Sequence, residues 1–172
     1  MSSMWNLELD KIVLPVSPAD IIESQCDYLR EYTNGKIIAK IANYEGVILS
    51  PNLFQHATPQ QNSGDNRVDI QEELGRYGGS KFTFELFITS TGTPNYKFRI
   101  MFLAYGIEYY PVIMVVDEEI ASEIEREQHI LCDNEYEFED MLKKILASKK
   151  VSKVINHLYS ATLREERRYI PY

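Results

Sequence analysis

The sequence predicts an α+β fold, in which helices pack against a mainly antiparallel sheet. Residues 81–116 alternate apolar and polar side chains with a period of two, and the turn-like run TGTPN interrupts them. This pattern is typical of a meander of three strands. Helical periodicity appears before and after it, at about 18–33, 135–147 and 150–163. Strands grouped together, rather than alternating with helices, favour an antiparallel sheet. The 172 residues suit a single globular domain, 1–172.

The first helix has clear start and stop signals. Ser17 can cap its N-terminus, Pro18 suits the first helical position, and Gly35 follows the last apolar residue of the stripe. Alternation resumes directly afterwards. We therefore expect a helix at 18–33, followed by a strand at about 37–42.

A polar stretch then interrupts the strand pattern. Residues 50–80 are rich in Gln, Asn and Gly and carry few apolar side chains. Such a composition buries too little surface to order itself. We expect a long polar insertion that is mobile, and a tail at 164–172.

The meander shows how the sheet should be covered. Its first strand has one polar face, whereas both faces of its second strand are apolar. Strict alternation places Ile100 and Phe102 on one face, and Met101 and Leu103 on the other. A strand that is apolar on both faces indicates that helices cover part of the back of the sheet.

The C-terminal third predicts a short helix capped by Asp117, a short strand at 129–132, and two longer helices. Asn134 can cap the helix at 135–147, which has acidic residues in its first turn and lysines near its end. The apolar residues of the helix at 150–163 do not continue the helical spacing of the apolar residues at 135–147. This mismatch predicts two packed helices rather than one long helix.

Charge is distributed unevenly along the chain. The net charge is −8 and the isoelectric point is about 4.9, which disfavours nucleic-acid binding by the chain as a whole. Residues 117–147 contain eleven acidic and three basic groups, whereas residues 148–172 contain six basic and two acidic groups. The two blocks can be neighbouring faces that offset each other in part. Alternatively, the acidic block can attract a basic partner.

Several patterns bear on the compartment. The N-terminus lacks a basic region followed by an apolar core, and no run is apolar for long enough to suggest a membrane span. Cys26 and Cys132 have no metal-ligand spacing. We therefore expect a cytoplasmic protein with reduced thiols, away from the membrane.

Catalytic motifs are weak. The sequence contains no zinc-ligand spacing, no phosphate-binding loop and no nucleophile elbow, so we expect no metal site and no cofactor. A metal-dependent or acid/base site around the 50–85 insertion is an alternative. Its candidate residues are His56, Asp69, Glu72, Glu73 and Glu85.

The first functional hypothesis is a non-catalytic interaction protein. An inhibitor, an immunity protein or an antitoxin-like protein that neutralises a basic protein partner fits the acidic block. The predicted acidic side chains of this surface are Asp117, Glu118, Glu119, Glu123 and Glu125. Tyr109 and Tyr110 are the predicted aromatic anchors.

A structural or assembly subunit is a further alternative. It would use a sheet edge or an apolar sheet face, for which Met101, Leu103 and Tyr105 are the candidates. The sequence leaves the oligomeric state open.

Overall fold

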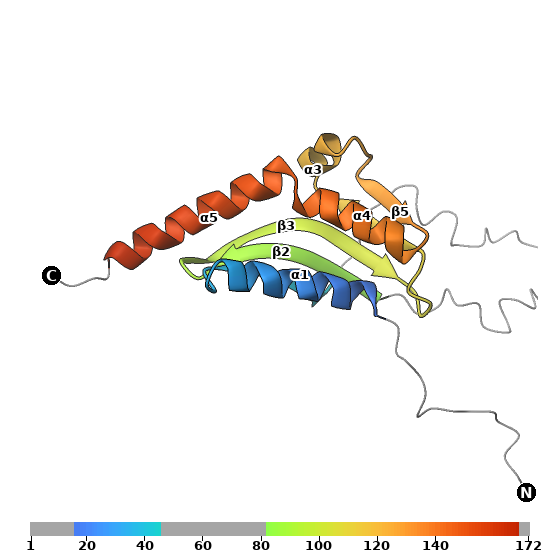
Figure 1. Cartoon of the computed structure of the whole chain (residues 1–172), viewed down its shortest axis with the longest axis horizontal. Helices are drawn as coiled ribbons and strands as arrows, with labels where there is room; N and C mark the ends of the chain where they lie inside the picture. The colour runs from blue at the N-terminus through green and yellow to red at the C-terminus, as the bar shows by residue number, and fades with distance from the viewer. Residues whose placement is uncertain (1–15, 46–81, 169–172) are drawn as a thin grey trace, which may run out of the picture.

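The computed structural model of the chain describes residues 16–45 and 82–168 (Figure 1). The predicted insertion at 50–80, its mobility, and the last residues of the predicted tail lie outside the described residues. The α+β prediction is confirmed. The elements, in chain order, are α1 (Pro18–Tyr32), β1 (Ile37–Asn43), β2 (Phe82–Ser90), β3 (Thr93–Tyr105), β4 (Val112–Val116), α3 (Glu118–Glu123), β5 (His129–Cys132), α4 (Glu135–Leu146) and α5 (Lys149–Arg168).

The described residues form a sheet of five strands, which lie side by side in the order in which they occur in the chain. Every neighbouring pair is antiparallel, so the central meander of β2, β3 and β4 is confirmed. One row of paired residues shows how the register builds the core: Leu103 lies opposite Met114, which lies opposite Ile130. All three are buried. The face that carries this row is therefore the inner face of the sheet.

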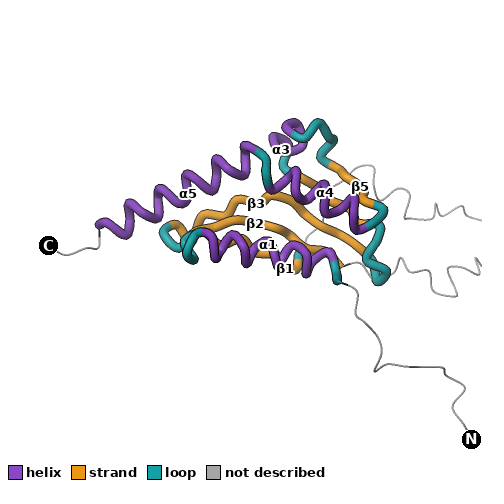
Figure 2. The backbone as a smooth tube through the Cα atoms, in the orientation of Figure 1, coloured by secondary structure: helices purple, strands orange, loops and turns teal. Residues whose placement is uncertain are grey.

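Helices α1, α4 and α5 cover that inner face. Helix α1 packs along β1, α5 crosses β2 and β3, and α4 lies near β5 (Figures 1 and 2). Side chains from the helices and from the inner face form one hydrophobic cluster, in which Ile22, Phe138 and Val151 are at most 1% exposed. Burial of this apolar surface is the main stabilising contribution to the fold. No helix within the two described ranges is both long and apolar enough to cross a membrane.

Strict alternation along β3 is a wrong prediction, because the strand contains a bulge. Leu86 lies opposite Met101, but the next residue of β2, Phe87, lies opposite Arg99, so Ile100 has no partner in the register. A bulge adds one residue and shifts every later side chain to the other face. Ile100 and Met101 are consequently both 1% exposed.

Burial of the β3 side chains also bears on the hypothesis of an assembly subunit with a free apolar sheet face. Met101, Leu103 and Tyr105 all lie in the hydrophobic cluster beneath the helices, and each is at most 6% exposed. The version of the assembly hypothesis that used these three side chains as a free sheet face is therefore wrong.

Two element boundaries differ from the predictions. Strand β4 begins at Val112, because residues 106–111 form a loop in which Tyr109 has a φ of 68° and the Tyr110–Pro111 peptide bond is cis. At the other end of the chain, α5 continues to Arg168 rather than ending at 163. The polar residues of its last turns have no apolar stripe, so periodicity did not reveal them.

The predicted helix signals are confirmed. Ser17 and Asp20 form a reciprocal capping box at the start of α1. At its end, the Gly35 N–H donates to the Arg30 carbonyl over 2.7 Å, and Gly35 has a φ of 76°. Asn134 caps α4 by accepting a hydrogen bond from the Glu137 N–H.

Two glycine substitutions test this packing. A Cβ at Gly92, in the turn between β2 and β3, would lie 2.6 Å from the Cα of Thr162 in α5. Because backbone cannot move aside, we expect Gly92→Ala to lower the free energy of unfolding by about 1–3 kcal/mol in chemical denaturation.

Gly35→Ala is the matched control. A Cβ there meets nothing within 4 Å, so only the left-handed backbone conformation opposes it, at a cost of about 1 kcal/mol. If Gly92→Ala left stability unchanged, the described contact between the turn and α5 would be wrong.

Candidate functional site

Glu85 is the one catalytic candidate within the described residues, since His56, Asp69, Glu72 and Glu73 lie outside them. Its carboxylate accepts hydrogen bonds from Lys97 and from Arg99, the latter over 2.8 Å. Burial raises the pKa of Glu85, but the hydrogen bonds and charges of Lys97 and Arg99 outweigh burial and hold the pKa below its ordinary value. Glu85 is therefore a fixed anion in an ion-pair cluster, which suits a general acid poorly.

The two cations of this cluster also lie over aromatic rings. The Lys97 Nζ is 4.1 Å from the centre of the Phe87 ring, and the Arg99 guanidinium is 4.7 Å from the centre of the Phe102 ring. These contacts arrange the outer face of the sheet, opposite the helices. Glu85, Lys97 and Arg99 therefore have a structural role in the sheet.

Nucleophiles and metal ligands give no site in the same part of the chain. Both cysteines are free and buried, and burial, followed by nearby carboxylates, raises the pKa of Cys26 and of Cys132 to about 11. Both thiols therefore stay protonated at neutral pH. Across residues 16–45 and 82–168, no group of three His, Cys, Asp or Glu side chains is arranged to hold a metal ion.

Three of the five predicted surface acids have partners within the fold. Asp117 caps α3, and Glu119 pairs with Lys150. The Glu123 carboxylate accepts hydrogen bonds from the first two N–H groups of α5, those of Lys149 at 2.6 Å and Lys150 at 3.0 Å. A carboxylate is well placed at the positive end of a helix. The acidic and basic blocks are thus neighbours that partly neutralise each other.

The other predicted residues are spread apart. Glu118 and Glu125 are exposed at the two ends of α3. Tyr109 and Tyr110 precede β4, whereas α3 follows it, so the tyrosines and the acids lie at opposite ends of that strand. The predicted residues therefore do not form one continuous surface.

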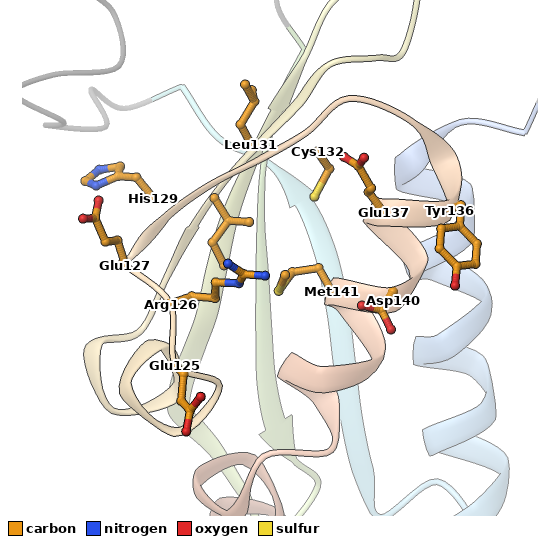
Figure 3. A pocket seen from close by; sticks show the side chains of 11 residues that line it. Glu125, Arg126, Glu127, His129, Leu131, Cys132, Tyr136, Glu137, Asp140 and Met141 are labelled. Atoms are coloured by element: carbon orange, nitrogen blue, oxygen red, sulfur yellow. The ribbon is translucent and has the colours of Figure 1, made fainter.

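A groove of about 770 Å³ lies between β5 and α4, and several acidic side chains line it (Figure 3). Its floor contains Ile130, Cys132 and Met141. Acidic side chains line its walls, with a single basic one among them. The charged residues of the groove are Glu125, Glu127, Glu137, Asp140 and Arg126.

Local structure explains this arrangement. The chain reverses at Glu125, which has a φ of 56° just after α3, and the backbone N–H of Arg126 then donates a hydrogen bond to the Ala121 carbonyl. Gln128 fixes the entry to β5, because its carbonyl accepts from the Val116 N–H and its side chain donates to the Val116 carbonyl. The reversal brings acidic residues to the start of β5.

The opposite wall comes from the first turns of α4. Buried Phe138 and Met141 fix the face that α4 turns toward the core. Glu137 and Asp140 then project from the neighbouring face beside β5, and Tyr136 is 80% exposed at the same end. Figure 3 shows Arg126 extending from the β5 side toward α4.

A second groove, of about 540 Å³ between α1 and α4, differs in chemistry. Its lining is mostly apolar, and its two charged residues, Glu139 and Lys143, have opposite signs. It therefore favours no charge in a partner. The groove beside β5 does, because its carboxylates outnumber its single guanidinium.

Of the acids that line this groove, the sequence prediction named Glu125 but not Glu127, Glu137 or Asp140. The acids on α4 looked like ordinary first-turn residues of a capped helix. Their position beside the groove depends on which strand α4 lies against, and periodicity does not reveal strand order.

Comparison of the chain with protein-family models, curated proteins and solved structures gives no match. The class is therefore defined by the structure: an α+β protein with an acid-walled groove beside the last strand of its sheet.

The Glu85 cluster makes a pH-dependent prediction. The folded pKa of Glu85 lies below its ordinary value of 4.5, so its contribution to stability is present above that pH and is lost as pH falls through the folded pKa. We expect Glu85→Gln to lower the free energy of unfolding by about 1–2 kcal/mol at pH 7. The difference should shrink below pH 4.5 in denaturation series. A difference independent of pH would contradict the ion-pair role.

Tyr110 is tested by removal of its hydroxyl. Its ring centre lies 6.4 Å from that of Phe138, and its buried hydroxyl has no hydrogen-bond partner among the described residues. Burial, followed by the charges of Glu135 and Glu139, raises its pKa to about 12. Tyr110→Phe keeps the ring and removes an unsatisfied polar atom, so we expect thermal stability to be unchanged or higher. A loss above about 1 kcal/mol would show that the hydroxyl has a partner.

Proposed function

We propose that this protein is a non-catalytic interaction protein that binds a basic protein partner through the acid-walled groove between β5 and α4. The observation that carries the proposal is the charge of the groove walls. Glu125 and Glu127 stand at the start of β5, and Glu137 and Asp140 stand on α4. Among the described residues that line the groove, Arg126 is the one Lys or Arg side chain.

The groove can contribute both selectivity and affinity. A concave surface lined by one sign of charge focuses its field and speeds encounter with an oppositely charged partner. Apolar side chains at the floor, Ile130 and Met141 among them, add binding energy when they are covered. A partner with Lys or Arg on an otherwise partly apolar surface satisfies both requirements.

The acids with partners inside the fold sharpen the proposal. Glu119 and Glu123 hold the start of α5, so replacing them would disturb the fold as well as the surface. Of the groove acids, Asp140 is ion-paired with Lys144 and Glu137 accepts a hydrogen bond from the Asp133 N–H, so Glu125 and Glu127 are the better candidates for a partner. Glu125 and Glu127 are exposed, and neither has an ion-pair partner within the described ranges.

Neutralisation of a basic protein is the role we favour. An inhibitor, immunity protein or antitoxin-like protein needs an acidic surface and no catalytic residues of its own. Free Cys26 and Cys132 favour a reducing, cytoplasmic location. An enzyme is the weaker candidate, because Glu85 is held by Lys97 and Arg99 and both thiols are protonated.

Charge reversal in the groove tests this function. We expect Glu125→Lys/Glu127→Lys to slow association with a basic partner about tenfold or more at low salt, measured by surface plasmon resonance after capture from the host. Binding of the unaltered protein should weaken as salt rises.

The matched control is Glu23→Lys/Glu31→Lys, which changes the net charge equally at exposed positions of α1 outside the groove. It should retain most of the binding. A captured partner that is acidic, or that binds both double variants equally, would contradict the proposal.

A further inference from the structure

We infer that the basic segment of the partner binds as an added strand along the outer edge of β5. This inference deepens the proposed function and rests on it. It specifies the conformation of the ligand, its pattern of side chains, and the backbone groups that hold it.

Strand β5 lies at one edge of the described sheet. It is the last strand in the order β1 to β5, and within the described residues it pairs only with β4. An edge strand presents backbone N–H and C=O groups on its open side, which can pair with an extended chain. This is how strand addition gives affinity.

The hydrogen bonds between β4 and β5 show which backbone groups of β5 are open. The Val116 N–H donates to the Gln128 carbonyl over 2.8 Å. Antiparallel pairs alternate between bonded and non-bonded, so the bonded pairs that follow are Met114 with Ile130, and Val112 with Cys132. The N–H and C=O groups of His129 and Leu131 therefore point away from β4, toward the open edge.

The groove beside β5 has room for a further strand. An added strand lies about 4.8 Å from its neighbour, and its side chains alternate between the two faces of the sheet. On the inner face, they meet Ile130 and the α4 wall with Glu137 and Asp140. On the outer face, they meet Leu131, which is 51% exposed.

This geometry defines the ligand. Lys or Arg suits the positions that face α4, because a long apolar stem covers Ile130 while its charged end reaches Glu137. Asp140 is already paired with Lys144, so a ligand cation would share that carboxylate. Apolar or β-branched residues suit the alternate positions, beside Leu131. The groove therefore selects an extended segment in which basic and apolar residues alternate. Charge complementarity is the reason we choose this occupant.

The experiment uses the full chain and a synthetic probe. The probe is a peptide of about seven residues, an ordinary strand length, that alternates Lys with Thr or Val. Its analogue carries N-methyl groups on the central amides, which removes strand pairing but keeps the charge. A third peptide has Glu in place of Lys. Calorimetric titration at low and physiological salt measures affinity.

Two variants of the chain separate backbone pairing from side-chain contact. Leu131→Pro removes the outward N–H without removing a bond to β4, and Leu131→Thr removes the apolar side chain but keeps the N–H. We expect Leu131→Pro to weaken binding of the Lys probe about 3- to 10-fold more than Leu131→Thr does. We expect Arg126→Gln to strengthen it about 2- to 5-fold, because the cation opposes a basic ligand.

The outcomes distinguish the inference from the function on which it rests. Binding of the Lys probe, lost on N-methylation and on Leu131→Pro, supports strand addition. Equal binding of the N-methylated peptide, or no binding of any Lys peptide, overturns it. The proposed function still stands in that case if groove charge reversal abolishes capture of a basic partner. It fails together with the inference if capture is unaffected.

Discussion

One apolar layer, between a single face of the sheet and helices α1, α4 and α5, holds this protein together. The bulge in β3 serves that layer, because it turns both Ile100 and Met101 toward the helices. Within residues 16–45 and 82–168 the helices lie over one face of the sheet, and the Glu85 cluster arranges charged and aromatic side chains on the other. The same arrangement leaves β5 at the edge of the sheet with α4 beside it, and this is where the groove forms.

Charge in the C-terminal half divides into two roles. Glu119 and Glu123 join α3 to the first turn of α5, so part of the acidic block neutralises part of the basic block inside the fold. Glu125 and Glu127 belong to the groove instead. The net charge of the block therefore overstates the surface that a partner meets. The placement of each carboxylate determines which ones can act in binding.

Local signals predicted much of the fold. Ser17 and Asn134 mark the starts of α1 and α4, and their short-range hydrogen bonds are the ones that the sequence pattern implies. The break between α4 and α5 followed from the phase of their apolar stripes. The bulge at Ile100 was not predictable, because both faces of β3 are apolar and either register satisfies the pattern.

The candidate site was harder to predict, since it depends on strand order. The acidic block was visible in the sequence, but nothing local shows that β5 ends the sheet or that α4 returns beside it. Tyr110 looked like an exposed anchor because tyrosines often are, yet its ring packs on Phe138. Long-range pairing determines these positions, and the spacing of residue types does not encode it directly.

Amide hydrogen exchange along β5 is a direct test of strand addition at this edge. In the free protein, we expect slow exchange for the inward N–H groups of Ile130 and Cys132 and fast exchange for those of His129 and Leu131. A bound basic segment should slow exchange at His129 and Leu131 while leaving the inward pair unchanged. Salt-sensitive binding that leaves the His129 and Leu131 amides exchanging as fast as before would contradict strand addition at this edge.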